Sequence, residues 1–227
     1  MNLDEHMIMV WIIAIEVLIL TVFTISTLTS YFKHKKHAAL YLSLNYISFA
    51  VAMTLHMVGH YDSVVSGFTT NFYNDASMVG KVFIVVGILF ILLFHGQFVK
   101  VNKTWKYIRI VFGVLLIFWL LLPTNFTYGG RSTVIMTYMF MALYGLIINL
   151  FLAVSFFKIT RETAARRMEV YSLGLGALTF LIYYFLMTIY GMTQSFFLMI
   201  ITQAVLFVAL LFYFIGIYLP KIMTKSK

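Results

Sequence analysis

The chain has 227 residues, of which 63% are hydrophobic and 10% are charged, and its formal net charge at pH 7 is +9. Soluble domains are about 45–50% apolar and about 25% charged, so this composition excludes a soluble globular fold and indicates an integral membrane protein. The absence of cysteine excludes disulfides, thiolate metal sites and cysteine lipidation. No stretch has the composition of a soluble domain, so we expect residues 1–227 to form one membrane domain.

Apolar runs long enough to cross a bilayer follow one another along almost the whole chain. The acidic N-terminus lacks the basic region of a cleaved signal peptide, so we expect the first run to be retained. The runs are continuously apolar without alternation, which favours helices over a β-barrel. The predicted fold class is all-α, a bundle of seven transmembrane helices. In chain order they cover residues 7–30, 38–59, 77–99, 107–123, 132–157, 168–190 and 195–219.

The distribution of basic residues predicts the orientation of the bundle. Alternate connections carry nearly all of them, and the opposite side has only Lys81 and Arg131. Because cytoplasmic loops are enriched in Lys and Arg, the rich side is expected in the cytoplasm, with the N-terminus outside and the C-terminus inside. This topology also accounts for the net charge, so we expect no nucleic-acid partner. The basic residues of the rich side are Lys33, Lys35, Lys36, Lys100, Lys103, Lys106, Arg109, Lys158, Arg161, Arg166, Arg167, Lys221, Lys225 and Lys227.

Two further features concern the layout of the chain. The longest outer connection, residues 60–76, is rich in Ser, Gly, Thr, Asn and Tyr, and we expect a surface loop there. The first and fifth predicted helices end in similar aromatic-basic steps, at residues 30–33 and 155–158, and similar Tyr-containing starts follow at residues 41–43 and 171–173. This similarity favours a parallel repeat of three helices, a linking helix and three helices, although any cytoplasmic helix end tends to look this way.

Glu16 is the main ionisable residue within a predicted span, about two turns into the first helix. Ionisable groups in hydrocarbon are costly and are functional candidates by default. Its expected partners are Lys81, near the outer end of the third helix, and His56 or His60 on the second. The functional interpretation is a proton- or cation-linked site, and the structural alternative is an ion pair that holds the first three helices together.

His56 and His60 stand four residues apart, which places them on one helix face. A zinc or copper ion accepts two imidazoles at this spacing, and Glu16, His6 or Asp62 would complete such a site. Asn45 would extend the same polar stripe inward. The alternative is that both are ordinary interfacial histidines.

Haem b is a further alternative, because it needs one histidine from each of two neighbouring helices. The candidate pairs are His37 with His95, and His60 with a residue such as His6. Against haem, the predicted helices from residue 107 onward contain no histidine. We therefore expect no cofactor, with haem b or a divalent metal ion as the alternatives.

The second half of the chain offers polar but uncharged side chains. Asn149 and Gln203 fall near the middle of their predicted helices, where interhelical hydrogen bonds are the usual explanation. Tyr184 belongs to a tyrosine-rich set that would either pack in the core or line a cavity for an amphipathic ligand.

Several absent motifs narrow the function. No lysine lies within residues 195–219, so a retinal Schiff base has no place there, and no serine-protease, aspartyl or zinc-protease pattern occurs. We therefore expect no enzyme. In layout the chain resembles the compact seven-helix input regions of some prokaryotic sensor kinases, through its topology, its basic turns at residues 33–36 and 161–167, and its helices starting near Tyr41 and Tyr171. This resemblance implies a receptor-like domain in a prokaryotic plasma membrane and transfers no functional residue.

Three classes of function stay open. The first is a receptor-like or partner-binding bundle that senses a small ligand or docks another membrane subunit or a second copy, without catalysis. The second is a small transporter or channel in which Glu16, Lys81, His56 and His60 couple to an ion. The third is a haem- or metal-binding redox subunit.

Overall fold

A computed structural model describes residues 3–67, 72–98, 103–122, 131–162, 167–193 and 195–223. Over these residues the chain is helical, with short turns and connections. The helices are α1 (Leu3–His34), α2 (His37–Ser66), α3 (Phe72–His95), α4 (Lys103–Leu120), α6 (Arg131–Glu162), α7 (Arg167–Thr193) and α8 (Phe196–Met223). An unbroken helix satisfies its own backbone hydrogen bonds, which is the requirement that hydrocarbon imposes on a chain this apolar.

Six of the seven described helices are long and apolar enough to cross a membrane, namely α1, α2, α3, α6, α7 and α8. The protein is therefore an all-helical membrane protein with several candidate spans. The seventh, α4, has 18 residues and carries Lys103, Lys106 and Arg109. Its length of about 27 Å falls slightly short of a hydrocarbon core of about 30 Å. The sequence predicted a span at residues 107–123, and α4 begins four residues earlier, within the basic segment.

Helix α1 shows the surface pattern expected of a membrane helix. Trp11, Leu18 and Ile25 are exposed, whereas Glu16 and Thr27 are buried. A soluble helix would bury the apolar side and expose the polar one. The outer surface of α1 is thus suited to lipid, and its buried polar residues Glu16 and Thr27 face other protein segments.

The connection between α2 and α3 differs from the sequence prediction. Helix α2 continues to Ser66 and ends at Gly67, which adopts the left-handed conformation with a φ of 61°. Helix α3 already begins at Phe72. The predicted surface loop over residues 60–76 was therefore wrong for most of its length. Polar composition indicated a loop, but these residues instead extend two helices beyond their apolar runs.

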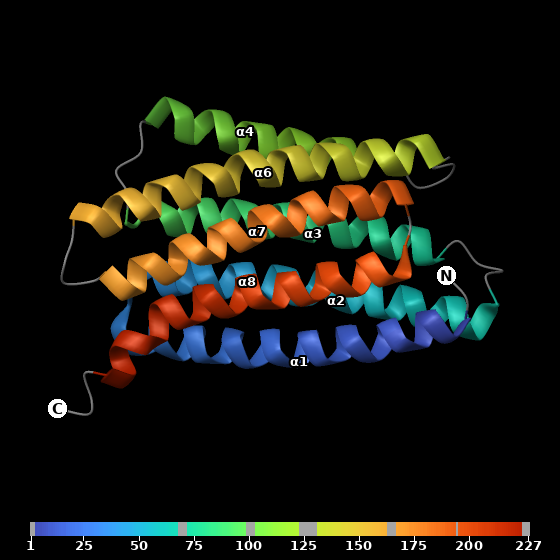
Figure 1. The fold of residues 1–227 in the computed structure, drawn as a ribbon, viewed down its shortest axis with the longest axis horizontal. Helices are drawn as coiled ribbons and strands as arrows, with labels where there is room; N and C mark the ends of the chain where they lie inside the picture. Colours follow the sequence, from blue (N-terminus) through green and yellow to red (C-terminus); the bar gives the residue numbers. More distant parts are fainter. Residues whose placement is uncertain are drawn as a thin grey trace. The chain divides into compact units, whose positions relative to one another are not determined.

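The chain divides into two compact units, Met1–Thr137 and Tyr138–Lys227. In the first unit, α1 packs on α2 and α2 on α3, with successive helices antiparallel, and α4 contacts α3 (Figure 1). In the second unit, α7 and α8 pack side by side as an antiparallel pair. The expected orientation in the membrane and the expected parallel repeat stay predictions.

The contact between α2 and α3 repeats every seven residues, which is the spacing of a close, coiled-coil-like helix seam. At each step one partner is a glycine, so the helices approach closely. The steps pair Gly59 with Tyr73 and Ala76, Gly80 with Ala52 and His56, and Gly87 with Asn45 and Phe49. This seam fixes the register of the polar residues on α2 relative to those on α3.

Glycines also mark the close contacts of the second unit. The Tyr184 ring of α7 covers Gly145 of α6, and Tyr213 of α8 covers Gly176 of α7. A methyl group added at Gly145 would lie 2.5 Å from the Tyr184 ring, so no larger residue fits there without a rearrangement. The tyrosines are therefore packing residues of this unit, whatever else they do.

Candidate functional site

The described ionisable side chains that are buried within candidate spans gather in the first three helices. Glu16 comes from α1, Lys81 from α3, and the histidine pair from α1 and α2. Burying such groups in a membrane bundle is costly. They are therefore the first place to look for function, and each is placed by the register of the helices that carry it.

Glu16 is 8% exposed, and its Oε2 atom has no hydrogen-bond partner among the described residues. Two contacts between α1 and α2 fix its level in the bundle. His6 meets His60 near one end, and the Phe23 ring lies 5.6 Å from the Tyr46 ring farther along. Glu16 falls between these contacts and is therefore level with the middle of α2.

Lys81 is 3% exposed, and its Nζ donates a hydrogen bond to the Sδ atom of Met78 at 3.6 Å. Its neighbour Gly80 lies against Ala52 in the middle of α2. Lys81 and Glu16 are thus at a similar level in the bundle, on two helices that both pack against α2. The structure records no ion pair between these two described side chains.

His56 is half-buried and lies in the α2–α3 seam. Its Nε2 is 3.1 Å from the position that a Cβ atom of Gly80 would occupy. The glycine therefore makes room for the imidazole, and places it beside the backbone that carries Lys81. His56 and Lys81 therefore belong to one neighbourhood of the first unit, and the expected pairing of Glu16 with either of them stays a prediction.

His6 and His60 form a direct contact between α1 and α2. Their Nδ1 atoms are 2.8 Å apart, so one imidazole donates a hydrogen bond and the other accepts it. His6 is 5% exposed and His60 is completely buried. The Tyr73 ring of α3 lies 5.7 Å from the His6 ring and 5.0 Å from the His60 ring. Side chains from three helices therefore meet at this end of the first unit.

The positions of the histidines bear directly on the haem and metal alternatives. Two haem ligands lie on opposite sides of the iron, and the direct hydrogen bond between His6 and His60 leaves no space for a porphyrin between them. No group of three or more His, Cys, Asp or Glu side chains placed to hold a metal ion occurs in the described parts of the chain. Of the other expected pair, His37 is exposed at the start of α2 and His95 is buried.

The two expected asparagines have different partners. The Nδ2 of Asn45 donates a hydrogen bond to the Gly87 carbonyl oxygen of α3 at 2.9 Å, whereas its Oδ1 has no hydrogen-bond partner among the described residues. The Nδ2 of Asn149 donates to the Gly145 carbonyl oxygen of its own helix at 2.8 Å. Asn45 therefore joins two helices, and Asn149 bonds within one.

Tyr184 and Gln203 belong to the second unit. The Tyr184 side chain is completely buried between Phe180 and Tyr183, and its hydroxyl has no hydrogen-bond partner among the described residues. The Oε1 atom of the half-buried Gln203 likewise has none. These two groups are unsatisfied polar atoms of the second unit.

Tyr73 is a site residue that the sequence analysis missed, because residues 60–76 were assigned to a loop. A signal for it exists in the sequence. Tyr73, Gly80 and Gly87 follow one another at seven-residue intervals on α3, and Gly59, Ala52 and Asn45 oppose them at the same interval on α2. Recognition of this shared seven-residue period would have predicted longer helices on both sides of the connection and would have placed Tyr73 next to His60.

No protein-family model, curated protein or solved structure matches this chain. Its function is therefore inferred from the chemistry of its own residues.

Proposed function

We propose that this protein is a small membrane transporter or channel whose ionisable residues in α1–α3 bind a coupling proton. The observation that carries the proposal is Glu16, a carboxyl group buried within a candidate span, whose Oε2 has no hydrogen-bond partner among the described residues. An unpaired carboxylate is expensive in a low-dielectric interior, so this group is stable there when a proton or a mobile cation neutralises it. A purely structural role would favour a neutral residue at this position.

The surrounding groups favour a proton over a metal cation. Hard cations such as calcium need six or more oxygen ligands, and alkali and alkaline-earth sites are built from carbonyl and carboxylate groups. At the level of Glu16, the ionisable neighbours on α2 and α3 are instead the nitrogen-bearing His56 and Lys81. Nitrogen bases of this kind accept and donate protons.

The histidines extend this chemistry toward one end of the first unit. His56 and His60 lie one helical turn apart on α2, and His60 is hydrogen-bonded to His6 of α1. Proton-exchanging groups are thus present at successive levels, from the end of α1 to the level of Glu16. This succession supports proton exchange between the Glu16 site and one side of the membrane.

A charge-displacement measurement tests the proposal. Proteoliposomes adsorbed on a solid-supported membrane are exposed to a rapid pH step, and separately to steps of sodium and potassium at constant pH. We expect a transient current on the pH step, which is abolished in Glu16→Gln and retained in Asp4→Asn. The control removes an exposed carboxylate from the same helix.

The possible outcomes distinguish the alternatives. A current on sodium or potassium steps alone would show that this cation, and not a proton, is the coupling ion. Absence of any current in the wild type, or a pH-step current of the same size in Glu16→Gln, would contradict the proposed coupling site.

A receptor-like or partner-binding bundle is the second candidate. It is favoured by the buried Tyr184 hydroxyl and the Gln203 Oε1, both without a hydrogen-bond partner in the described structure. A ligand with its own donor and acceptor groups would satisfy such atoms. Ligand-induced thermal stabilisation that is lost in Tyr184→Phe and Gln203→Leu, in a protein that gives no ionic current, would support this candidate over the transporter.

A further inference from the structure

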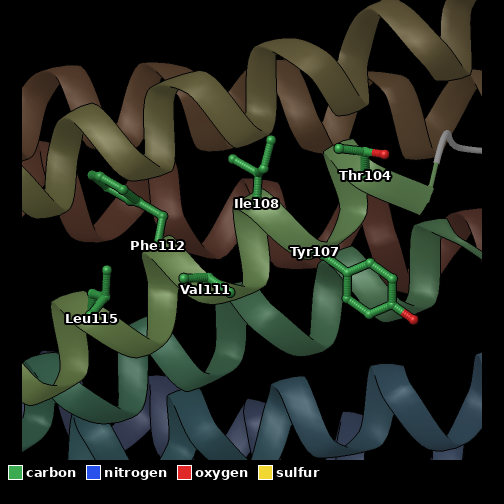
Figure 2. A pocket seen from close by; sticks show the side chains of 6 residues that line it. All are labelled: Thr104, Tyr107, Ile108, Val111, Phe112 and Leu115. Atoms are coloured by element: carbon green, nitrogen blue, oxygen red, sulfur yellow. The ribbon is translucent and has the colours of Figure 1, made fainter.

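Helix α4 carries a hollow of about 470 Å³ along one face. All of its lining residues belong to this helix and are exposed, so nothing in the hollow selects a ligand. A buried nitrogen atom without a hydrogen-bond partner among the described residues is found instead in His60, on α2. Figure 2 shows the side chains that line the hollow, which are Thr104, Tyr107, Ile108, Val111, Phe112 and Leu115.

The two ring nitrogens of His60 have different surroundings. Its Nδ1 atom is hydrogen-bonded to the Nδ1 atom of His6 at 2.8 Å, whereas its Nε2 atom has no hydrogen-bond partner in the described part of the chain. The side chain is completely buried, so leaving this nitrogen unsatisfied is destabilising. A hydrogen bond that only joined α1 to α2 would not require the second nitrogen, which therefore points to a further role.

His60 has a histidine on either side of it. His6 lies in the second turn of α1, one turn from the exposed Leu3. His56 lies one turn farther from the end of α2, and residues at this spacing have Cβ atoms about 5–6 Å apart. His60 therefore stands between a histidine near the beginning of α1 and one beside the backbone that carries Lys81.

The hydrogen bond between the two Nδ1 atoms requires that only one of them carry a hydrogen. In one arrangement His6 donates through its Nδ1–H, and His60 carries its hydrogen on Nε2. When a proton binds at Nε2 of His6, the Nδ1–H proton can cross to Nδ1 of His60, and the Nε2–H proton of His60 then leaves. One proton enters and one leaves, and the pair ends in the opposite arrangement, with His60 as the donor.

We propose that His60 relays protons between His6 and His56, and so connects the Glu16 site with one end of the first unit. This proposal rests on the proposed proton-coupled function. An imidazole suits the role because one nitrogen accepts a proton while the other releases one. The Tyr73 ring of α3 packs edge-on against both imidazoles and holds them in place.

The rate of the pH-step current tests the relay. Proteoliposomes are selected through an affinity tag at the N-terminus, so that the side of His6 faces the solution. We expect the current to rise about a hundredfold more slowly in His60→Gln, since glutamine can form a hydrogen bond but cannot relay a proton. His95→Gln is the control, because it changes another buried histidine of the first unit and should leave the rate unchanged.

A second variant separates proton relay from packing. His60→Ala leaves space for a small ring, so added imidazole should restore the wild-type rate, whereas pyrrole, a ring of the same size without a basic nitrogen, should not. The carboxylic-acid infrared band of Glu16 should still change with pH at equilibrium in both variants. The relay determines how fast the carboxyl group binds a proton, and not whether it does.

The outcomes separate this proposal from the proposed function. A wild-type rate in His60→Gln, or equal rescue by imidazole and pyrrole, would overturn the relay and leave the Glu16 site in place. Loss of the Glu16 band in His60→Gln would also overturn it, because His60 would then shape the site itself. Absence of any current in the wild type would remove the relay together with the proposed function.

Discussion

At the scale of single residues, the polar side chains of α1–α3 differ in how their hydrogen bonds are satisfied. Thr27 donates to the Phe23 carbonyl oxygen at 2.8 Å, and Ser43 donates to that of Ala39 at 2.7 Å, both within their own helices. Such bonds let short hydroxyl side chains enter a membrane helix at small cost. Glu16 has no equivalent arrangement for its Oε2, which is why it carries the functional argument and Thr27 and Ser43 do not.

Asn45 allows a prediction at the same scale. Its hydrogen bond to Gly87 joins α2 to α3, so Asn45→Leu should lower the free energy of unfolding by about 0.6 to 1.7 kcal/mol, the range measured for interhelical bonds in membranes. Asn149→Leu is the control, because Asn149 bonds to its own helix. Unfolding in mixed micelles measures the loss of free energy of unfolding in both variants. An equal or larger loss in Asn149→Leu would contradict the assigned role of Asn45.

The residue types of the candidate site were predictable, and their contacts were not. Glu16, Lys81 and the histidines stand out in the sequence because ionisable groups are rare in apolar runs. Which of them meet depends on the register between helices, and the glycine steps of the α2–α3 seam set that register. The sequence analysis did not derive this register, so Tyr73 and the direct His6–His60 bond emerged only from the structure.

At the scale of helices, the apolar runs predicted each of the seven helices in the described part of the chain, and the errors lie at their ends. Hydropathy identifies the part of a helix that lies in hydrocarbon, but a helix continues past that boundary where no residue stops it. On α2 the stop is Gly67, in the left-handed conformation. On α4 the basic residues that were read as a connection form the first turns of the helix itself.

Gly67 provides the prediction at this scale. No atom lies within 4 Å of the position that its Cβ would occupy, so substitution affects only the backbone conformation. Because a left-handed residue other than glycine costs about 1–2 kcal/mol, Gly67→Ala should loosen the last turn of α2. Hydrogen exchange at residues 61–66 should become faster in Gly67→Ala and change less in Gly67→Asn, since asparagine tolerates this conformation. Unchanged exchange in Gly67→Ala would show that other contacts fix this turn.

At the scale of the whole molecule, the sides on which the two termini lie depend on whether α4 crosses the membrane. Seven spans place the termini on opposite faces, as the distribution of basic residues predicts, whereas the six long apolar helices alone would place them on the same face. The repeat of three, one and three helices also depends on α4 as the linking span.

The absence of native cysteine makes the topology directly measurable. Single cysteines are introduced as Asp4→Cys and Lys227→Cys, and intact cells are treated with a membrane-impermeant maleimide. We expect Asp4→Cys to be labelled in intact cells and Lys227→Cys only after lysis. Labelling of both, or of neither, in intact cells would place the termini on one side and remove α4 from the spans.

The central claim is that Glu16 exchanges a proton within the membrane, and infrared difference spectroscopy tests it most directly. Wild-type protein, Glu16→Gln and Asp4→Asn in lipid are compared before and after a pH step. The account predicts a carboxylic-acid carbonyl band that changes with pH in the wild type and in Asp4→Asn and is missing in Glu16→Gln. An identical difference spectrum in Glu16→Gln would show that Glu16 does not titrate, and would contradict the proposed coupling site.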